Sequence, residues 1–166
     1  DICKKYPRLI YASASGFGQT GPLKELPAYD MVVQGMGGLM SVTGQPNSEP
    51  TRVGTSIGDI TAGLFTTVGI NAALYDREKT GKGTFIDVSM LDCQIAILEN
   101  AIARYLAKNE IPKPMGSRHP SIAPFEAFKT KDSHIIIAAG NEKLFEKLCN
   151  VLNIPEISKD PKFNTN

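Results

Sequence analysis

Apolar residues recur at helical spacing over residues 59–79, which is the clearest secondary-structure signal in the chain. Further apolar residues fill the other faces of this segment, so we expect most of the predicted helix to be buried. A charged last turn followed by Gly81 is typical of a helix end. The recurring apolar positions are Ile60, Leu64, Val68, Ala72 and Tyr75.

Two short apolar segments flank this helix and have the composition of strands. Residues 8–13 are β-branched and aromatic at their centre, and residues 84–90 alternate between two sets of side chains. A second helix is predicted over residues 92–108. The order strand, helix, strand, helix predicts a parallel sheet with crossover connections, and therefore an α/β fold.

A weaker helical signal covers residues 30–40, where Asp30 is a candidate N-cap but three glycines lower the helix propensity. The composition changes at Ile111, where four prolines in close succession indicate a linker. Beyond it, residues 126–130 and 134–139 predict a β-hairpin, and Asn141 is a candidate cap for a last helix.

Composition and charge exclude several classes of protein. The 166 residues carry a net charge of +1, so neither a basic nucleic-acid-binding surface nor an acidic tail is present. No uninterrupted apolar run approaches the roughly 20 residues that span a bilayer. Three widely separated cysteines and two histidines give no zinc or disulfide pattern, which favours a reducing, cytoplasmic location. Because the chain opens on Asp1 and not Met, we expect both ends to be cuts, and a processed organelle import sequence stays an alternative.

The first candidate site is a glycine loop with the spacing Gly16-x-Gly18-x-x-Gly21, directly after the first predicted strand. This is the spelling of a dinucleotide-binding loop. That function requires a helix to begin within the glycines, so that its N-terminus meets the pyrophosphate. Pro22 and Pro27 follow instead, which favours a tight loop at the carboxyl end of a strand.

The second candidate is Asp59, which lies at the start of the long predicted helix. Asp is among the best N-caps, and this is the plain structural interpretation. Three small neighbours, Gly58, Ala62 and Gly63, leave room for a bulky group to approach. The helix N-terminus favours an ionised carboxylate, which can attack a carbonyl or thioester, and free amides there could stabilise an oxyanion.

Two further candidates have strong structural interpretations. Tyr29 is expected to be a half-buried packing residue whose hydroxyl has a partner. The loop over residues 116–124 carries Arg118 and His119, but no Gly-x-Ser-x-Gly nucleophile elbow accompanies them. A lone histidine in such a loop is more often a hydrogen-bonding residue than a catalyst.

Six short segments of the chain, taken together, resemble one protein family. The chain resembles the family III CoA-transferases, the group that includes formyl-CoA transferase and crotonobetainyl-CoA:carnitine CoA-transferase. Each segment is short, but their order and spacing run through nearly the whole chain. The matching segments are residues 15–22 (SGFGQTGP), 28–34 (AYDMVVQ), 38–44 (GLMSVTG), 58–59 (GD), 77–83 (REKTGKG) and 118–124 (RHPSIAP).

The resemblance implies a domain organisation, since the family's members are roughly twice this length or more. Residues 1–110 would form part of a large Rossmann-like domain, residues 111–124 a proline-rich linker, and residues 125–166 the start of a small α+β domain. It further implies an interlocked homodimer, coenzyme A thioesters as substrates, and neither a bound cofactor nor a metal.

The resemblance also implies roles for individual residues. Asp59 would be the nucleophile that carries CoA as an aspartyl thioester between two carboxylic acids. Tyr29 falls on the family's active-site tyrosine, and the residues expected to bind substrate are Tyr29, Gly58, Gly116 and Arg118. Gly116 falls where some members carry a run of glycines that shields the intermediates from water, and this chain has only one.

Two alternatives stay open at this point. The related α-methylacyl-CoA racemases have a histidine at the position of Tyr29, paired with the aspartate as opposed bases. Tyrosine, with an ordinary pKa near 10, is a poor substitute for that base, which favours the transferase. The segment alone could also be an inactive piece whose exposed strand edges invite association.

Overall fold

The structure, a computed structural model, describes residues 2–163. It divides into two compact units, Asp1–Pro114 and Met115–Asn166, and the boundary lies inside the proline-rich segment 111–124. Each unit is described by itself below.

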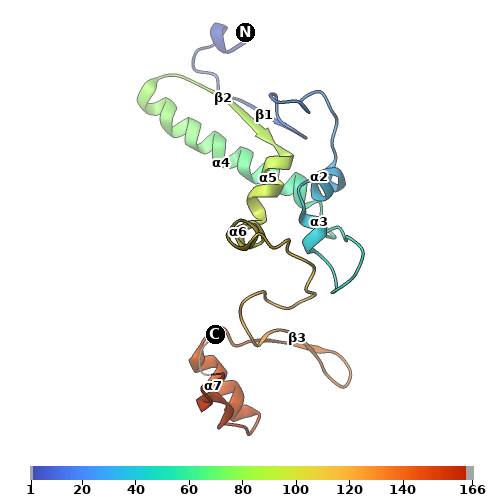
Figure 1. The fold of residues 1–166 in the computed structure, drawn as a ribbon. Coiled ribbons are helices and arrows are strands. Elements are labelled where there is room, and N and C mark those ends of the chain that lie inside the picture. Colours follow the sequence, from blue (N-terminus) through green and yellow to red (C-terminus); the bar gives the residue numbers. More distant parts are fainter. Residues whose placement is uncertain (1, 164–166) are drawn as a thin grey trace. The chain divides into compact units, whose positions relative to one another are not determined.

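A parallel pair of strands organises the first unit. Strands β1 (Tyr11–Ser15) and β2 (Phe85–Ser89) pair in register, with Ser13 opposite Asp87. The long helix α4 (Ile57–Thr80) makes the crossover between them (Figure 1). The predicted α/β fold with a parallel sheet is therefore confirmed. The first strand begins later than predicted and extends to Ser15, because the chain still turns at residues 6–9, where the Leu9 amide donates to the Tyr6 carbonyl.

The core of this unit lies where α4 meets the short helix α2 (Asp30–Met36), strand β2 and helix α5 (Met90–Ile97). Small residues on α4 allow the close approach. A methyl group at Gly69 would lie 3.0 Å from the Cγ2 atom of Ile86 on β2. The buried apolar cluster consists of Val33, Ala62, Val88, Met90 and Cys93.

The prediction that most of α4 is buried was wrong for the described residues. Only Gly58, Thr61, Ala62 and Ala73 are buried. Leu64 and Val68 are 61% and 65% exposed. Two strands and three short helices are too few elements to surround a helix of 24 residues, so one side of α4 has no cover in this chain.

Two predicted helices are each divided in two. The first ends at Met36, and after a turn in which Gly38 adopts a φ of +85° the chain forms α3 (Leu39–Val42). The second begins at Met90, not Asp92, because Ser89 caps it by accepting from the Asp92 amide at 3.2 Å. It gives way to α6 (Glu99–Lys108) at Leu98. A four-residue helix, α1 (Ile2–Lys5), was not predicted.

By length and composition alone, α4 is apolar enough to cross a membrane, because an 18-residue window within it has a mean hydropathy of 1.3. The core helix of a soluble protein meets the same criterion. Here α4 packs on both strands and on α2 and α5, and 22% of that window is buried.

The second unit is a hairpin followed by a helix. Strands β3 (Phe125–Lys129) and β4 (His134–Ala138) are antiparallel, as predicted. Helix α7 (Glu142–Val151) begins after Asn141, whose side chain accepts from the Leu144 amide at 3.0 Å, so the predicted cap is confirmed. A 3₁₀ turn, η1 (Ile157–Lys159), is the last helical element of the described chain.

Candidate functional site

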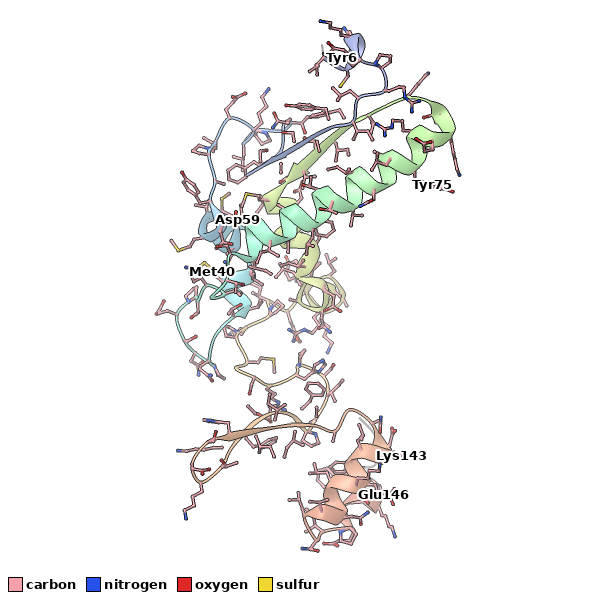
Figure 2. All side chains as sticks on the ribbon, turned by 180° about the vertical axis from the view of Figure 1, so that it is seen from behind. Tyr6, Met40, Asp59, Tyr75, Lys143 and Glu146 are labelled. Atoms are coloured by element: carbon pink, nitrogen blue, oxygen red, sulfur yellow. The ribbon has the colours of Figure 1, made fainter. Side chains whose placement is uncertain are left out.

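Asp59 lies exposed in the first turn of α4, beside helix α2 (Figure 2). It is the third residue of the helix, and the N-cap position belongs to Ser56. The structural interpretation of Asp59 as the N-cap is therefore wrong. Among the residues that the structure describes, no hydrogen bond or ion pair involves the Asp59 carboxylate. That carboxylate is available to react.

The capping of α4 comes from another helix. Asp30 of α2 is buried, and its Oδ1 atom accepts from the backbone amide of Gly58 at 2.8 Å. Asp30 thus caps the second residue of α4 and not its own helix, where Tyr29 holds the N-cap position. Since the Ile57 amide also donates, to the Thr55 carbonyl, two of the first three amides of α4 are already paired. Fewer free backbone amides are therefore left to stabilise an oxyanion than the sequence indicated.

Gly58 permits contact between two helices. A methyl group there would lie 2.7 Å from the Cγ2 atom of Val33 and 3.1 Å from the Oδ1 atom of Asp30. The space that the sequence suggested for a ligand is thus filled by α2, and Ala62 is buried beside it. Gly63 differs, because a methyl group there would meet no atom of the described structure within 4 Å.

Tyr29 is 81% exposed, so the prediction of a half-buried packing residue was wrong. Its backbone carbonyl accepts from the Val32 amide at 2.9 Å and fixes the start of α2. Tyr29 and Asp59 adjoin the two ends of the hydrogen bond between Asp30 and Gly58. The structure thus brings the two residues to neighbouring positions, both at the protein surface.

A polar network that the sequence analysis missed lies behind these two residues. Gln34 is fully buried, donates from Nε2 to the Oδ2 atom of Asp30 at 2.8 Å, and accepts from the Val53 amide at 2.8 Å. The Arg52 guanidinium lies 3.8 Å from the same Asp30 oxygen. The available signal was a pair of polar residues four positions apart in an otherwise apolar helix.

The remaining predicted residues belong to the second unit. Gly116 has a φ of +65°, which favours glycine, and Arg118 is exposed. His119 accepts at Nδ1 from the amides of Ser121 and Ile122, at 3.2 and 3.1 Å. His119 is therefore a loop hydrogen-bonding residue, as the sequence analysis favoured. The two units are not placed relative to one another, so no distance joins these residues to Asp59.

The glycine loop after β1 is folded back onto the sheet. The Gln19 amide donates to the Asp87 carboxylate at 2.8 Å, and its side chain donates to Ser13 at 3.0 Å. The next helix begins only at Asp30. The helix that a dinucleotide-binding loop needs is thus missing at the glycines.

Two of the larger cavities in the described structure lie away from Asp59. One of about 570 Å³ lies between residues 5–10 and the last turns of α4, and another of about 600 Å³ lies in the second unit. Within residues 2–163, no group of three His, Cys, Asp or Glu side chains could hold a metal ion. Asp59 therefore lies exposed at a helix end that a hydrogen bond from Gly58 attaches to α2.

Comparison with known proteins places this chain in a family. The model of CoA-transferase family III matches residues 1–166. The chain belongs to this family. The resemblance stated from its sequence segments is thereby confirmed.

Relatives in this family support the same assignment. The chain is 50% identical to the acetyl-CoA:oxalate CoA-transferase of Acetobacter aceti over all of its length and 43% of that protein's. It is 43% identical to the succinyl-CoA:glutarate CoA-transferase of Mus musculus, over 38% of that protein. A CaiB/BaiF family protein from Brucella suis matches with a TM-score of 0.80 and 44% identity, over 99% of this chain and 44% of that one. The chain thus spans less than half the length of these family members.

Proposed function

We propose that the protein transfers coenzyme A from an acyl-CoA to a small carboxylic acid, with Asp59 as the covalent carrier. The observation that carries this proposal is an exposed, unpaired Asp59 carboxylate at the held end of α4, in a chain that matches the family over its whole length. Named relatives that move CoA to oxalate or glutarate favour dicarboxylates as acceptors.

The chemistry uses two exchanges at one carboxylate. A carboxylate oxygen of Asp59 attacks the thioester carbonyl carbon, and CoA leaves as the thiolate, giving a mixed anhydride. The thiolate then attacks the aspartyl carbonyl carbon and displaces the donor as its carboxylate, which leaves an aspartyl-CoA thioester. The acceptor carboxylate repeats these steps in reverse and regenerates Asp59. The covalent route replaces one difficult transfer by several easier steps.

Other residues have supporting roles in this proposal. Tyr29 lies next to the capped end of α4 and would contact the acyl group through its exposed ring and hydroxyl. Gly58 holds the nucleophile's backbone close to α2. Gly116 and Arg118 would bind or cover substrate from the second unit. No observation favours the racemase over the transferase, because position 29 carries a tyrosine where the racemases have a histidine.

The same proposal extends to the complete polypeptide. Residues 1–110, 111–124 and 125–166 would be part of its large domain, its linker and the start of its small domain. We propose an interlocked homodimer and a cytoplasmic location, with coenzyme A as substrate and no resident cofactor. Sedimentation of the full-length protein tests the dimer, and a monomeric, fully active enzyme contradicts it.

Substitution of the nucleophile tests the proposed function. A full-length polypeptide that carries this segment is incubated with acetyl-CoA or succinyl-CoA, and its intact mass and peptide map are recorded. We expect a CoA-sized adduct on Asp59, which oxalate or glutarate discharges. Asp59→Ala should remove the adduct and lower transfer by more than about a thousandfold, because no other group replaces the nucleophile.

The matched control is Asp76→Ala, which removes an exposed carboxylate near the other end of the same helix. It should leave both adduct and transfer unchanged. Substantial transfer by Asp59→Ala contradicts the proposal. Exchange of solvent deuterium into an α-methyl acyl-CoA, without any transfer, would favour the racemase instead.

A further inference from the structure

Two buried polar residues of α2 bond to each other and to the chain segment that precedes Asp59. Asp30 is 8% exposed and Gln34 is fully buried, and they bond to each other at 2.8 Å. Asp30 holds the Gly58 amide, and Gln34 holds the Val53 amide at 2.8 Å. Burying such groups costs free energy unless their polar atoms are paired, and here both Asp30 oxygens and both polar atoms of the Gln34 side chain have partners.

The remaining bonds of Asp30 and Gln34 reach the segment that leads into Asp59. Gln34 contacts Val53 and, at 3.5 Å, the Thr55 carbonyl, whereas Asp30 contacts Gly58. Arg52 is itself turned onto this segment, since its Nε atom donates to the Val53 carbonyl at 3.2 Å. The chain before Asp59 is therefore fixed to α2 at several points, and the last of them is the residue before the nucleophile.

We propose that Asp30 and Gln34 are a positioning pair that sets the location and direction of the Asp59 carboxylate. The proposal rests on the proposed function, in which Asp59 is the nucleophile. Neither residue is required to touch substrate, because each acts through the backbone of residues 53–58. A displacement of about 1 Å in a reacting group costs about a hundredfold in rate, so loosening this attachment should lower kcat more than it raises KM.

The donors and acceptors of the pair suggest a charge-exchange experiment. Asp30→Asn alone brings two NH₂ groups together, and Gln34→Glu alone brings two carboxylates together. The double variant loses the 3.5 Å contact of position 34 with the Thr55 carbonyl and the ion pair of position 30 with Arg52. It restores the shorter bonds, because the new amide at position 30 can accept from Gly58 and donate to the new carboxylate at position 34. That carboxylate can in turn accept from Val53. In the full-length protein, we expect each single variant to lower kcat by about a hundredfold and the double variant to recover at least about tenfold.

The measurements are steady-state kcat and KM, and the single-turnover rate of adduct formation on Asp59 from acetyl-CoA or succinyl-CoA. All are made below the melting temperature of every variant. Asn141→Ala is the matched control, because it also removes a side-chain helix cap but on α7 of the second unit. It should lower the melting temperature and leave kcat unchanged, which separates positioning from a merely structural role.

Single variants with native kcat overturn the proposal, and so does a folded double variant that is no faster than either single variant. If a single variant does not fold, the folded double variant decides alone. Near-native kcat in the double variant supports the pair, and a hundredfold loss contradicts it. Failure of the proposed function gives a different result, because the unsubstituted protein would then form no adduct on Asp59 at all.

Discussion

At the scale of single residues, Gly58 and Asp59 are neighbours with opposite environments. Gly58 is buried against α2, and Asp59 is exposed on the next position around the helix. Successive residues of a helix are rotated by about 100°, so one can pack while the next faces outward. The sequence motif of these two residues therefore combines a packing requirement with a reactive group, and the two can be tested separately.

Substitution of the two glycines of α4 nearest Asp59 separates packing from helix propensity. Gly58→Ala should destabilise by about 1–3 kcal/mol, because its methyl group would overlap Val33. Gly63→Ala, which meets no described atom within 4 Å, should stabilise by about 0.5–1 kcal/mol, since alanine is the better helix former. Urea unfolding of the full-length protein measures both. Equal effects would show that α2 does not constrain Gly58.

The buried thiol of Cys93 gives a prediction with a pH dependence. Burial, followed by the neighbouring Asp92 charge, raises the pKa of the Cys93 thiol above its ordinary value. Because the thiolate is the reactive form, alkylation of Cys93 should begin only at a higher pH than for an exposed thiol. The folded state keeps the proton more tightly, so this contribution to stability is complete below the unfolded-state pKa and is lost as pH rises through the folded one.

Peptide mapping after a pulse of iodoacetamide at a series of pH values measures this effect. Cys3, which is half-buried, provides the internal comparison. We expect Cys3 to be labelled first at every pH. Labelling of Cys93 as fast as Cys3 at neutral pH would contradict its buried position on α5, in the cluster with Ala62 of α4 and Val88 of β2.

At the scale of elements, local signals predicted what local interactions determine. Asn141 was predicted as the cap of α7 because its partner, Leu144, is three residues away. Asp30 was predicted to cap its own helix, yet its carboxylate bonds to Gly58, which is 28 residues away. A side chain's distant partner cannot be read from spacing, so the Asp30–Gln34 network was missed although both residues were visible.

The two breaks in the predicted helices differ in how far the sequence signals them. Gly35, Gly37 and Gly38 weakened the first helix prediction, and the structure ends α2 there. The break between α5 and α6 had no glycine or proline to signal it, since it occurs at Leu98 and Glu99, with Glu99 at a φ of +36°. Helix periodicity continued through this break and predicted a single helix. Local propensity therefore gives no reason for the end of α5.

The cap of α7 carries the prediction at this scale. Asn141→Ala should destabilise the second unit by about 1 kcal/mol, because the Leu144 amide loses its acceptor. Asn141→Asp keeps the acceptor and adds a favourable charge at the helix N-terminus, so stability should be equal or higher. Thermal unfolding of the three proteins measures the order. A melting temperature for the alanine variant equal to that of the unsubstituted protein would show that the cap contributes nothing.

At the scale of the whole molecule, the exposed side of α4 and the open sheet edges dominate. Leu64, Val68 and Tyr75 are more than 60% exposed on this helix. Parallel sheets are normally covered on both faces, and two strands alone are marginal in water. Since the chain spans 38% to 43% of relatives such as the CoA-transferases of Mus musculus and Acetobacter aceti, the cover in a full-length member would come from residues outside this segment.

This imbalance predicts how the 166-residue chain behaves alone. Its exposed apolar side and its free strand edges should drive self-association, which sedimentation velocity measures as a size that grows with concentration. Val68→Lys, on the exposed side of α4, should reduce that association because it places a charge in the apolar contact. Asn71→Lys adds the same charge to the same helix at an exposed polar position and should change it little.

In the full-length protein, Val68→Lys should be harmful and not beneficial. If the exposed side of α4 is covered there, Val68→Lys buries an unpaired charge and should destabilise by several kcal/mol, whereas Asn71→Lys should be tolerated. A Val68→Lys protein as stable as the unsubstituted one would show that this side of α4 faces water in the full-length protein too. Association of the isolated segment would then come from its strand edges, and the helix would be open to a partner.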